Sequence, residues 1–464
     1  MFGMTMIPFS TPVGNMYFHH PMNKTKASPV LTLFPLTMIV IGLVIGMGIF
    51  RTSRDAAAAS PDPTVFFLAW IAGGLVAFCG ALTYAEIGSR YPVTGGYYKI
   101  FSYAYHPAVA FAINCSILIS NAASVAGVAL IGSEYILPVL FPEAGEGLLN
   151  TIAILAIAGF YGLNMLGLRI SSRVLNVLML IKIAMLAVVI VALFIPSMHN
   201  PDPIAWEGTG NLSFGALLLA FGVALKATSF TYGGYQQTIN FGGEVDRPQR
   251  TIPRAIFIGI FVIVSIYLLV SLSYYKVIGL VELRDTSSIA SVVAERMFGP
   301  VASTITSVLL FIAVLAYVNV SLLSNPRVMF AMSEDGILPA SFRKKNEEKD
   351  VLTVSLTVFA AICIIVLFFA DTFDKILSFV IFIDSIGMAT SAATIFILRK
   401  RTRHLDNTGI YKMKLYPLLP VIFVLAYLFV GTVIAIHNPE YAGIGAIVLA
   451  VLSGIYFISR KKTN

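Results

Sequence analysis

Long apolar runs with few charges follow one another along almost the whole chain of 464 residues. A helix needs about 20 apolar residues to cross the hydrocarbon core of a bilayer, whereas a strand of a membrane barrel needs only about 10 residues of alternating polarity. Most of these runs are long and do not alternate, so they predict helices. The predicted fold class is an all-α integral membrane protein with twelve transmembrane helices, at residues 31–59, 64–89, 103–139, 148–166, 172–195, 211–243, 254–275, 299–332, 351–370, 374–398, 416–436 and 441–459.

The composition agrees with a lipid environment and excludes several other classes of protein. Hydrophobic residues make up 58% of the chain and charged residues only 12%, against about 25% charged residues in a soluble domain. A cytosolic enzyme, a secreted disulfide scaffold and a disordered protein are thereby excluded. The three cysteines lie inside apolar runs and lack the spacing of metal ligands. Because no catalytic cluster or nucleotide-binding loop is found, we predict no catalytic residue, no metal and no cofactor.

The positive charges are distributed unevenly between the two sides of the membrane. An even number of spans places both termini on one side, and most of the 31 Lys and Arg residues fall in the tails and loops of that side. Since loops rich in Lys and Arg stay in the cytoplasm, we predict cytoplasmic tails at 1–30 and 460–464 in a multi-pass protein of the plasma membrane. The net charge of +8 is therefore a signal of topology. It gives no reason to expect a nucleic-acid partner.

Two of the predicted spans are interrupted by glycines. The first contains the sequence GLVIGMGIF at 42–50, and the sixth contains FTYGGY at 230–235. Backbone at membrane depth leaves the helix only where it is buried in protein or lines a cavity, and broken helices at matching places of two inverted halves indicate a transporter site. We therefore predict two inverted repeats, at 31–195 and 211–400, followed by two further spans at 416–459. Close packing of small residues is the alternative for either span taken alone.

Several stretches resemble the amino acid–polyamine–organocation (APC) superfamily, and within it the L-type amino acid transporters and their bacterial relatives. These stretches are GLVIGMGIF at 42–50, YAEIG at 84–88, YPVTGGY at 91–97, FTYGGY at 230–235 with the segment that follows it to 255, and the segment 325–339. The resemblance implies the LeuT-type fold, a 5+5 inverted repeat in which helices 1 and 6 are broken. Leu43 and Met47 stand where the superfamily has serines, so the side-chain preference is left open.

The two breaks predict a site for a zwitterion. Free N–H groups at the start of a half-helix bind a carboxylate, and carbonyl groups released from a helix accept hydrogen bonds from an ammonium group. We expect the backbone of 45–49 to hold the α-carboxylate of an amino acid, and the carbonyl groups of 230–232 to hold its α-ammonium. Phe230 and Tyr235 are the aromatic residues expected to close over the substrate. The predicted substrate-binding residues are Ile45, Gly46, Met47, Gly48, Ile49, Phe230, Thr231, Tyr232, Gly233 and Tyr235.

Charged residues at membrane depth are costly and indicate function. Lys182 lies about halfway through the fifth span, which contains no acid. In the L-type branch a lysine at this place approaches the first break and substitutes for the sodium ion of sodium-coupled relatives, so the resemblance implies a coupling role for Lys182. A gating network is expected from three residues near the cytoplasmic ends of spans, Glu86, Glu244 and Arg327. No role is predicted for three further cations, Arg51, Arg54 and Lys226.

Together these features predict a secondary active amino acid transporter that works by alternating access. We expect it to be independent of sodium, with exchange and proton coupling both open. A polyamine or other organic-cation carrier is the main alternative, but it would need extra acids at the site, and none lies in either break. An integral membrane enzyme is a remote alternative. The expected partners are a small amino acid and membrane lipid, whereas the oligomeric state and an accessory subunit are left open.

Overall fold

The computed structural model describes residues 31–46, 48–143, 147–194, 213–286, 288–368, 373–403 and 409–461, and within these ranges the chain is helical apart from its connections and three isolated bridges. The predicted tail at 1–30 lies outside the described residues, as do residues 462–464. The first half contains α1 Leu33–Val44, α2 Gly48–Ala59, α3 Pro63–Arg90, α4 Gly96–Ala104, α5 Pro107–Leu140, α6 Gly147–Met165 and α7 Leu168–Val191. The second half contains α8 Phe214–Tyr232, the 3-10 helices η2 Tyr235–Asn240 and η3 Gly242–Glu244, α9 Pro248–Ile278, α10 Leu280–Asp285, α11 Ile289–Phe298, α12 Pro300–Glu334, η4 Ala340–Arg343, α13 Thr353–Leu367, α14 Phe373–Arg401, α15 Leu418–His437 and α16 Pro439–Lys461.

Polar residues and prolines mark the starts of several long helices. The side chain of Asp62 accepts a hydrogen bond from the N–H of Val65 at 2.9 Å, and Pro63 opens α3. Ser213 caps α8 in the same way through the N–H of Ala216, at 3.2 Å. Such caps satisfy N–H groups that have no partner inside the helix, and a proline in the first turn removes none of its hydrogen bonds. These residues punctuate the apolar runs, which is why most helices begin close to where the sequence predicts.

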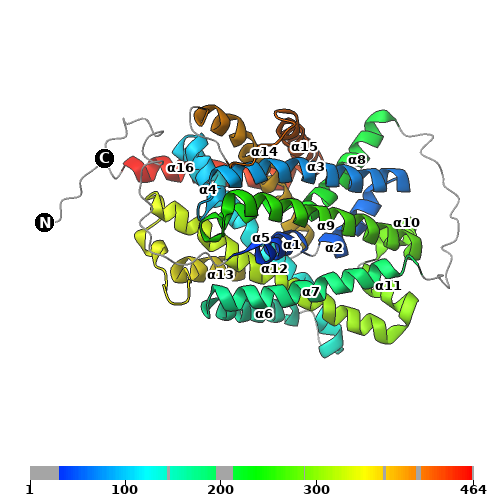
Figure 1. Ribbon diagram of the computed structural model, residues 1–464. Helices are drawn as coiled ribbons and strands as arrows, with labels where there is room; N and C mark the ends of the chain where they lie inside the picture. The colour runs from blue at the N-terminus through cyan, green and yellow to red at the C-terminus, as the bar shows by residue number, and fades with distance from the viewer. Residues whose placement is uncertain are drawn as a thin grey trace.

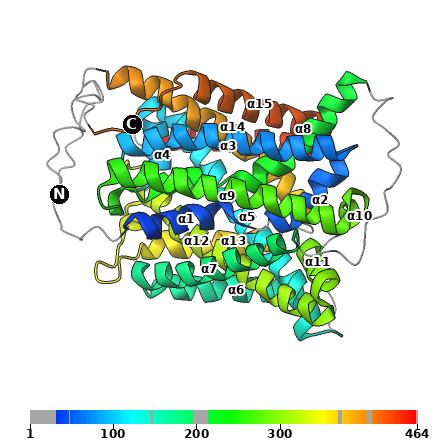
Figure 2. The ribbon, with the colours of Figure 1, turned by 45° about the vertical axis from the view of Figure 1, so that its right-hand side comes forward.

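The long helices form one bundle in which they run roughly along a common direction (Figures 1 and 2). Among the described residues, eleven helical segments are long and apolar enough to cross a membrane. α5 is central, because 89% of its most apolar window is buried, whereas only 6% of the corresponding window of α16 is buried. Large apolar side chains are exposed on the outer helices, for example Leu155, Leu425 and Ile458. Such an outer surface suits lipid rather than water.

The helix boundaries differ from the predicted spans in three places. Within the predicted ninth span, 351–370, the described residues form the 15-residue helix α13, so eleven segments rather than twelve reach the length of a span in the described part of the chain. The predicted third span, 103–139, covers parts of two helices, because Pro107 starts α5 after α4 has ended at Ala104. The connection after α9 contains two further helices, α10 and α11. Apolar content alone does not show these turns.

One end of the bundle, which we call the charged end, is held together by ion pairs at the C-terminal ends of α3, α12 and α14. Nε of Arg399, near the end of α14, donates to Glu86, near the end of α3, at 2.7 Å. Nζ of Lys99, in the following α4, donates to Asp335 at the end of α12 at 2.6 Å. The helices α12 and α14 therefore both end here. The intervening α13 must accordingly start at this end and run toward the opposite one.

Candidate functional site

The first break separates α1 from α2. α1 ends at Val44, Ile45 has the non-helical dihedral angles φ −74° and ψ 82°, and α2 begins at Gly48. Carbonyl groups in this segment bond side chains from other helices. The hydroxyl of Tyr267 donates to the carbonyl of Val44 at 3.3 Å, and Nζ of Lys182 donates to the carbonyl of Ile45.

The second break separates α8 from a 3-10 helix. α8 continues to Tyr232, and the chain then turns at Gly233 and Gly234, the latter with φ +113°. Residues with a β-carbon adopt such a φ only at a cost. After the turn the chain forms η2 and η3, which are 3-10 helices rather than a second α-helical half. The interruption is thus narrower than the predicted 230–235.

The two breaks pack directly against each other. A β-carbon on Gly48 would lie 2.9 Å from the Cα of Thr231, and one on Gly234 would lie 2.1 Å from the carbonyl oxygen of Leu43. The hydroxyl groups of Thr52 and Thr231 also form a hydrogen bond, which ties α2 to α8. The backbones approach closely because glycine stands at each crossing point. Segments that are far apart in sequence therefore form one site.

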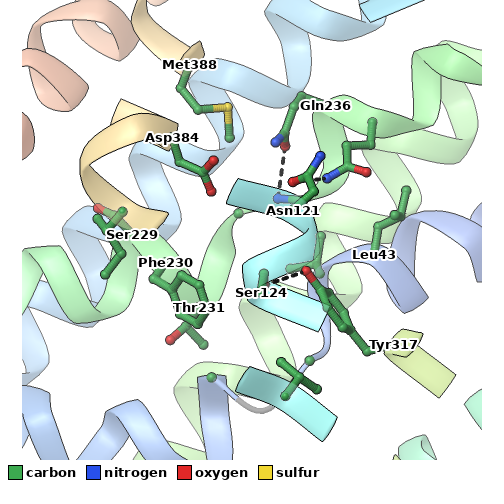
Figure 3. Close-up of a pocket in the computed structure, with 18 of the residues that line it drawn as sticks. Leu43, Asn121, Ser124, Ser229, Phe230, Thr231, Gln236, Tyr317, Asp384 and Met388 are labelled. Atoms are coloured by element: carbon green, nitrogen blue, oxygen red, sulfur yellow. Dashed lines mark hydrogen bonds between the residues drawn. The ribbon is translucent and has the colours of Figure 1, made fainter. Parts of the chain in front are cut away.

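A cavity lies beside the crossed breaks, enclosed by α1, α2, α5, α8, η2, α12, α14 and α15 (Figure 3). Five predicted substrate-binding residues line it, namely Gly46, Gly48, Phe230, Thr231 and Gly233. Four others are close in sequence but do not line it, namely Ile45, Ile49, Tyr232 and Tyr235. Met47 lies outside the described residues. The sequence therefore locates the cavity better than it assigns individual side chains to its wall.

The two aromatic residues expected to close over the substrate point in different directions. Phe230 lines the cavity, and Figure 3 shows it beside Thr231. The ring of Tyr235 is fully buried and packs edge-to-face on Tyr84, with a centroid separation of 6.0 Å. Of these two aromatic residues, only Phe230 is thus placed to touch a molecule in the cavity.

Lys182 of α7 lies behind the first break, and its side chain is fully buried. The carbonyl of Ile45, to which it donates, belongs to the residue that directly follows α1. No ion pair joins Lys182 to an acid within the described residues. The positive charge is therefore directed at the released backbone of the break.

A polar wall of side chains, which the sequence reading missed, faces the cavity from α5 and η2. Nδ2 of Asn121 donates to Asn325 at 2.6 Å, and Nε2 of Gln237 donates to Asn121 at 3.2 Å. The hydroxyl groups of Ser124 and Tyr317 are 2.9 Å apart. The pair of glutamines that directly follows the second break is the signal in the sequence that points to this wall.

Asp384 of α14 also lines the cavity and was missed for a different reason. It lies in the apolar run 374–398, away from both breaks, where the substrate-binding residues are predicted to lie. The hydroxyl of Ser120 donates to it at 3.1 Å. No acid lies in either break, but this acid lines the cavity. A single acid in the middle of a span was the available signal.

The three predicted gating residues belong to two separate clusters. Nε and a terminal nitrogen of Arg327 donate to the carboxylate of Glu244 at 2.9 and 2.8 Å, which joins α12 to η3. Glu86 is fully buried and accepts from Arg399 of α14 at 2.7 Å and from Arg90, one turn further along α3, at 2.8 Å. Both clusters lie at the charged end. Glu86 therefore does not bond the Glu244–Arg327 pair.

The three cations without a predicted role are bound away from the cavity. Arg51 pairs with Glu134 of α5 at 3.8 Å, and Nε of Arg54 donates to a backbone carbonyl of α10 at 3.1 Å. Nζ of Lys226 donates to Asn438, between α15 and α16, at 3.4 Å. None of the three lines the cavity.

Membrane-crossing helices with two breaks crossed beside a buried cavity are typical of a membrane transporter. The chain belongs to the amino acid permease family, whose model matches residues 31–457. The protein is therefore a multi-pass membrane transporter and not an enzyme.

Similar proteins agree with this assignment. The serine/threonine exchanger SteT of Bacillus subtilis (strain 168) is 27% identical over 390 residues, which cover 83% of this chain and 86% of SteT. The human large neutral amino acids transporter small subunit 2 is 25% identical over 390 residues, covering 82% of this chain and 70% of that protein. The human b(0,+)-type amino acid transporter 1 is 24% identical over 387 residues, covering 82% and 77%. The resemblance to the L-type branch of the APC superfamily is confirmed.

Proposed function

We propose that the chain is a sodium-independent amino acid transporter of the plasma membrane that works by alternating access. The family and the named transporter relatives support an amino acid as the substrate. The observation that carries the proposal is the buried Lys182, whose Nζ donates to the carbonyl of Ile45 in the first break. An ammonium group and a sodium ion each supply one positive charge to such a carbonyl. Lys182 therefore takes the place of a coupling ion.

The substrate headgroup is proposed to bind where the two breaks cross. The first N–H groups of α2 have no partner inside their helix and carry the positive end of its dipole. Because Gly48 both opens α2 and lines the cavity, these groups are available to an α-carboxylate. Carbonyl groups at the end of α8 receive the α-ammonium, and Phe230 covers the bound molecule. The headgroup is thus bound mainly by backbone.

The proposed architecture is the LeuT-type 5+5 inverted repeat with twelve spans. Support for the repeat comes from the breaks in the first and sixth spans, which start the units 31–195 and 211–400; two further spans at 416–459 follow. α13 is counted as a span because the helices before and after it both end at the charged end. We place this end in the cytoplasm, since most Lys and Arg residues fall in its loops.

The ion pairs of the charged end are proposed as the cytoplasmic gate. The Glu244–Arg327 pair joins η3, just beyond the second break, to α12. The Glu86 cluster joins α3 to α14. If these pairs hold the charged end closed, they must separate when the cavity opens to the cytoplasm. Partly buried charged pairs suit a gate because they are specific in geometry.

Uptake by purified protein in liposomes tests the proposal. We expect saturable uptake of a neutral amino acid that is unchanged when external sodium is replaced by choline. Lys182→Met keeps the length and apolar stem of the side chain but removes its charge, so we expect uptake to be lost while the protein still folds. Lys226→Met removes a cation from α8 outside the cavity and serves as the matched control, with uptake retained.

Three outcomes would contradict the proposal. Uptake that collapses in choline would show that sodium is required. A fully active Lys182→Met would remove the coupling role of this lysine. Flux that never saturates would indicate a pore rather than a carrier. A folded state of the variant is checked by its elution as a single species and by its thermal unfolding.

A further inference from the structure

The cavity carries one charged side chain among the described residues that line it, and that side chain is negative. Asp384 faces the cavity from α14, together with Ile381 and Met388 of the same helix. Positions three and four residues apart share one face of a helix, so α14 presents an acid flanked by two apolar side chains. In the described part of the chain no ion pair supplies a cation to Asp384, and the hydroxyl of Ser120 is its hydrogen-bond donor, at 3.1 Å.

The position of Asp384 separates it from the proposed headgroup site. A β-carbon on Gly46, in the first break, would lie 3.3 Å from the ring of Tyr317, so this break adjoins Tyr317. Figure 3 shows Asp384 and Tyr317 on different parts of the cavity wall, with Asp384 near Met388 and Tyr317 bonded to Ser124. The α-ammonium of an amino acid is attached one carbon away from its carboxylate. Asp384, which lies away from the first break, is therefore reached by the side chain of the substrate.

We propose that Asp384 binds the positively charged end of the side chain of a basic amino acid such as lysine or ornithine. The inference rests on the proposed function, because it takes the headgroup to be bound at the crossed breaks. A carboxylate at membrane depth is costly without a cation, and an alkylammonium group supplies one. The methylene stem of such a side chain packs on Ile381 and Met388, whose apolar surfaces flank the acid.

Three ligands that differ by one group each test the proposal on the unmodified protein. Norleucine is lysine without its ε-ammonium group, and cadaverine is lysine without its α-carboxylate. In competition for amino acid uptake, we expect lysine to bind at least about tenfold more tightly than norleucine or cadaverine. Each of these two ligands lacks one charged contact, and such a contact contributes about a tenfold gain in affinity. Equal affinity for norleucine and lysine would overturn the inference while saturable uptake of norleucine left the proposed function intact.

Two other outcomes would overturn the inference together with the proposed function. Equal affinity for cadaverine and lysine would show that the carboxylate is not used, which would overturn both proposals in favour of an organic-cation carrier. The absence of saturable uptake for all amino acids tried would likewise overturn both.

A substitution links the preference to the residue. Asp384→Asn keeps the shape and removes the charge, so we expect the affinity for lysine to fall by about 30-fold or more and the affinity for norleucine to stay within about twofold. Asp285→Asn makes the same change on the exposed end of α10 and serves as the matched control, with no change for either ligand. An equal loss for lysine and norleucine would overturn the inference. If Asp384→Asn does not fold, Asp384→Glu replaces it and must keep the preference for lysine.

Discussion

Two neighbouring glycines of the second break differ in what they require of the backbone. Gly233 has φ −71°, which any residue adopts, and a β-carbon there would lie 3.3 Å from the carbonyl of Phe230. Gly234 has φ +113°, and a β-carbon there would overlap the carbonyl of Leu43 in α1. The sequence shows both glycines as equal members of one motif. Only the second is tied by geometry to the crossing of the two breaks.

Gly234→Ala is therefore expected to destabilise the protein more than Gly233→Ala. The positive φ alone costs about 1–2 kcal/mol for a residue with a β-carbon, and the contact with Leu43 adds to this by pushing α1 away from η2. The measurement is thermal unfolding of the purified protein in detergent, with Gly233→Ala as the matched control. Equal melting temperatures for the two variants would contradict the role assigned to Gly234.

Sequence reasoning about single residues locates the cavity where backbone lines it and is weaker where the direction of a side chain decides. Gly46, Gly48 and Gly233 line the cavity as expected, because an interrupted helix needs small residues in any case. Tyr235 follows the turn at Gly233 and Gly234, so helical spacing no longer predicts where its side chain points. Asp384 lies far from both breaks in sequence, and only the packing of α14 brings it to the same cavity.

At the scale of elements, the presence of the long helices could be predicted from the sequence, but the residues at which they begin and end could not. Apolar length predicted the long helices because lipid leaves a crossing chain few alternatives. It could not separate the end of α4 from the start of α5, nor show that the chain beyond Gly234 forms 3-10 turns. For the charged end, the sequence predicted a network of charged residues but not which residues pair. The buried Glu86 bonds Arg399 across 313 positions of sequence, a pairing that spacing does not reveal.

The Glu86 cluster is expected to contribute strongly to the stability of the charged end. Glu86→Gln leaves the guanidinium groups of Arg90 and Arg399 without their carboxylate partner. The side chain of Arg90 is only 6% exposed, so this charge would be left buried without its pair. Breaking a buried pair by removing one partner costs about 3–5 kcal/mol, so we expect a clear fall in melting temperature. Glu282→Gln, which breaks the more exposed pair with Arg296 (48% and 25% exposed), is the control and should cost about 1 kcal/mol or less. A fall of equal size in both variants would contradict this account.

At the scale of the whole molecule, the number of crossings depends on α13. Its 15 residues rise about 22 Å as an α-helix, less than the roughly 30 Å of the hydrocarbon core, so length alone does not identify it as a span. The ends of its neighbours give a second criterion. α12 ends beside Lys99 and α14 ends beside Glu86, both at the charged end. A chain that leaves and returns to one end must cross the bundle in between, and α13 is the helix available for that crossing.

This connectivity predicts the sidedness of three internal connections. An epitope inserted after Lys349, before α13, and one inserted after Gly409, beyond α14, should both be protected in intact cells and bind antibody only after permeabilisation. An epitope between α13 and α14, at 369–372, should bind antibody on intact cells. The first two results also test the cytoplasmic placement of the charged end, and uptake by each insertion variant confirms that it is folded. If α13 does not cross, the insertions after Lys349 and at 369–372 will lie on the same side, and the count of twelve spans will be wrong. If all three results are reversed, α13 does cross but the charged end faces outward, against the distribution of Lys and Arg.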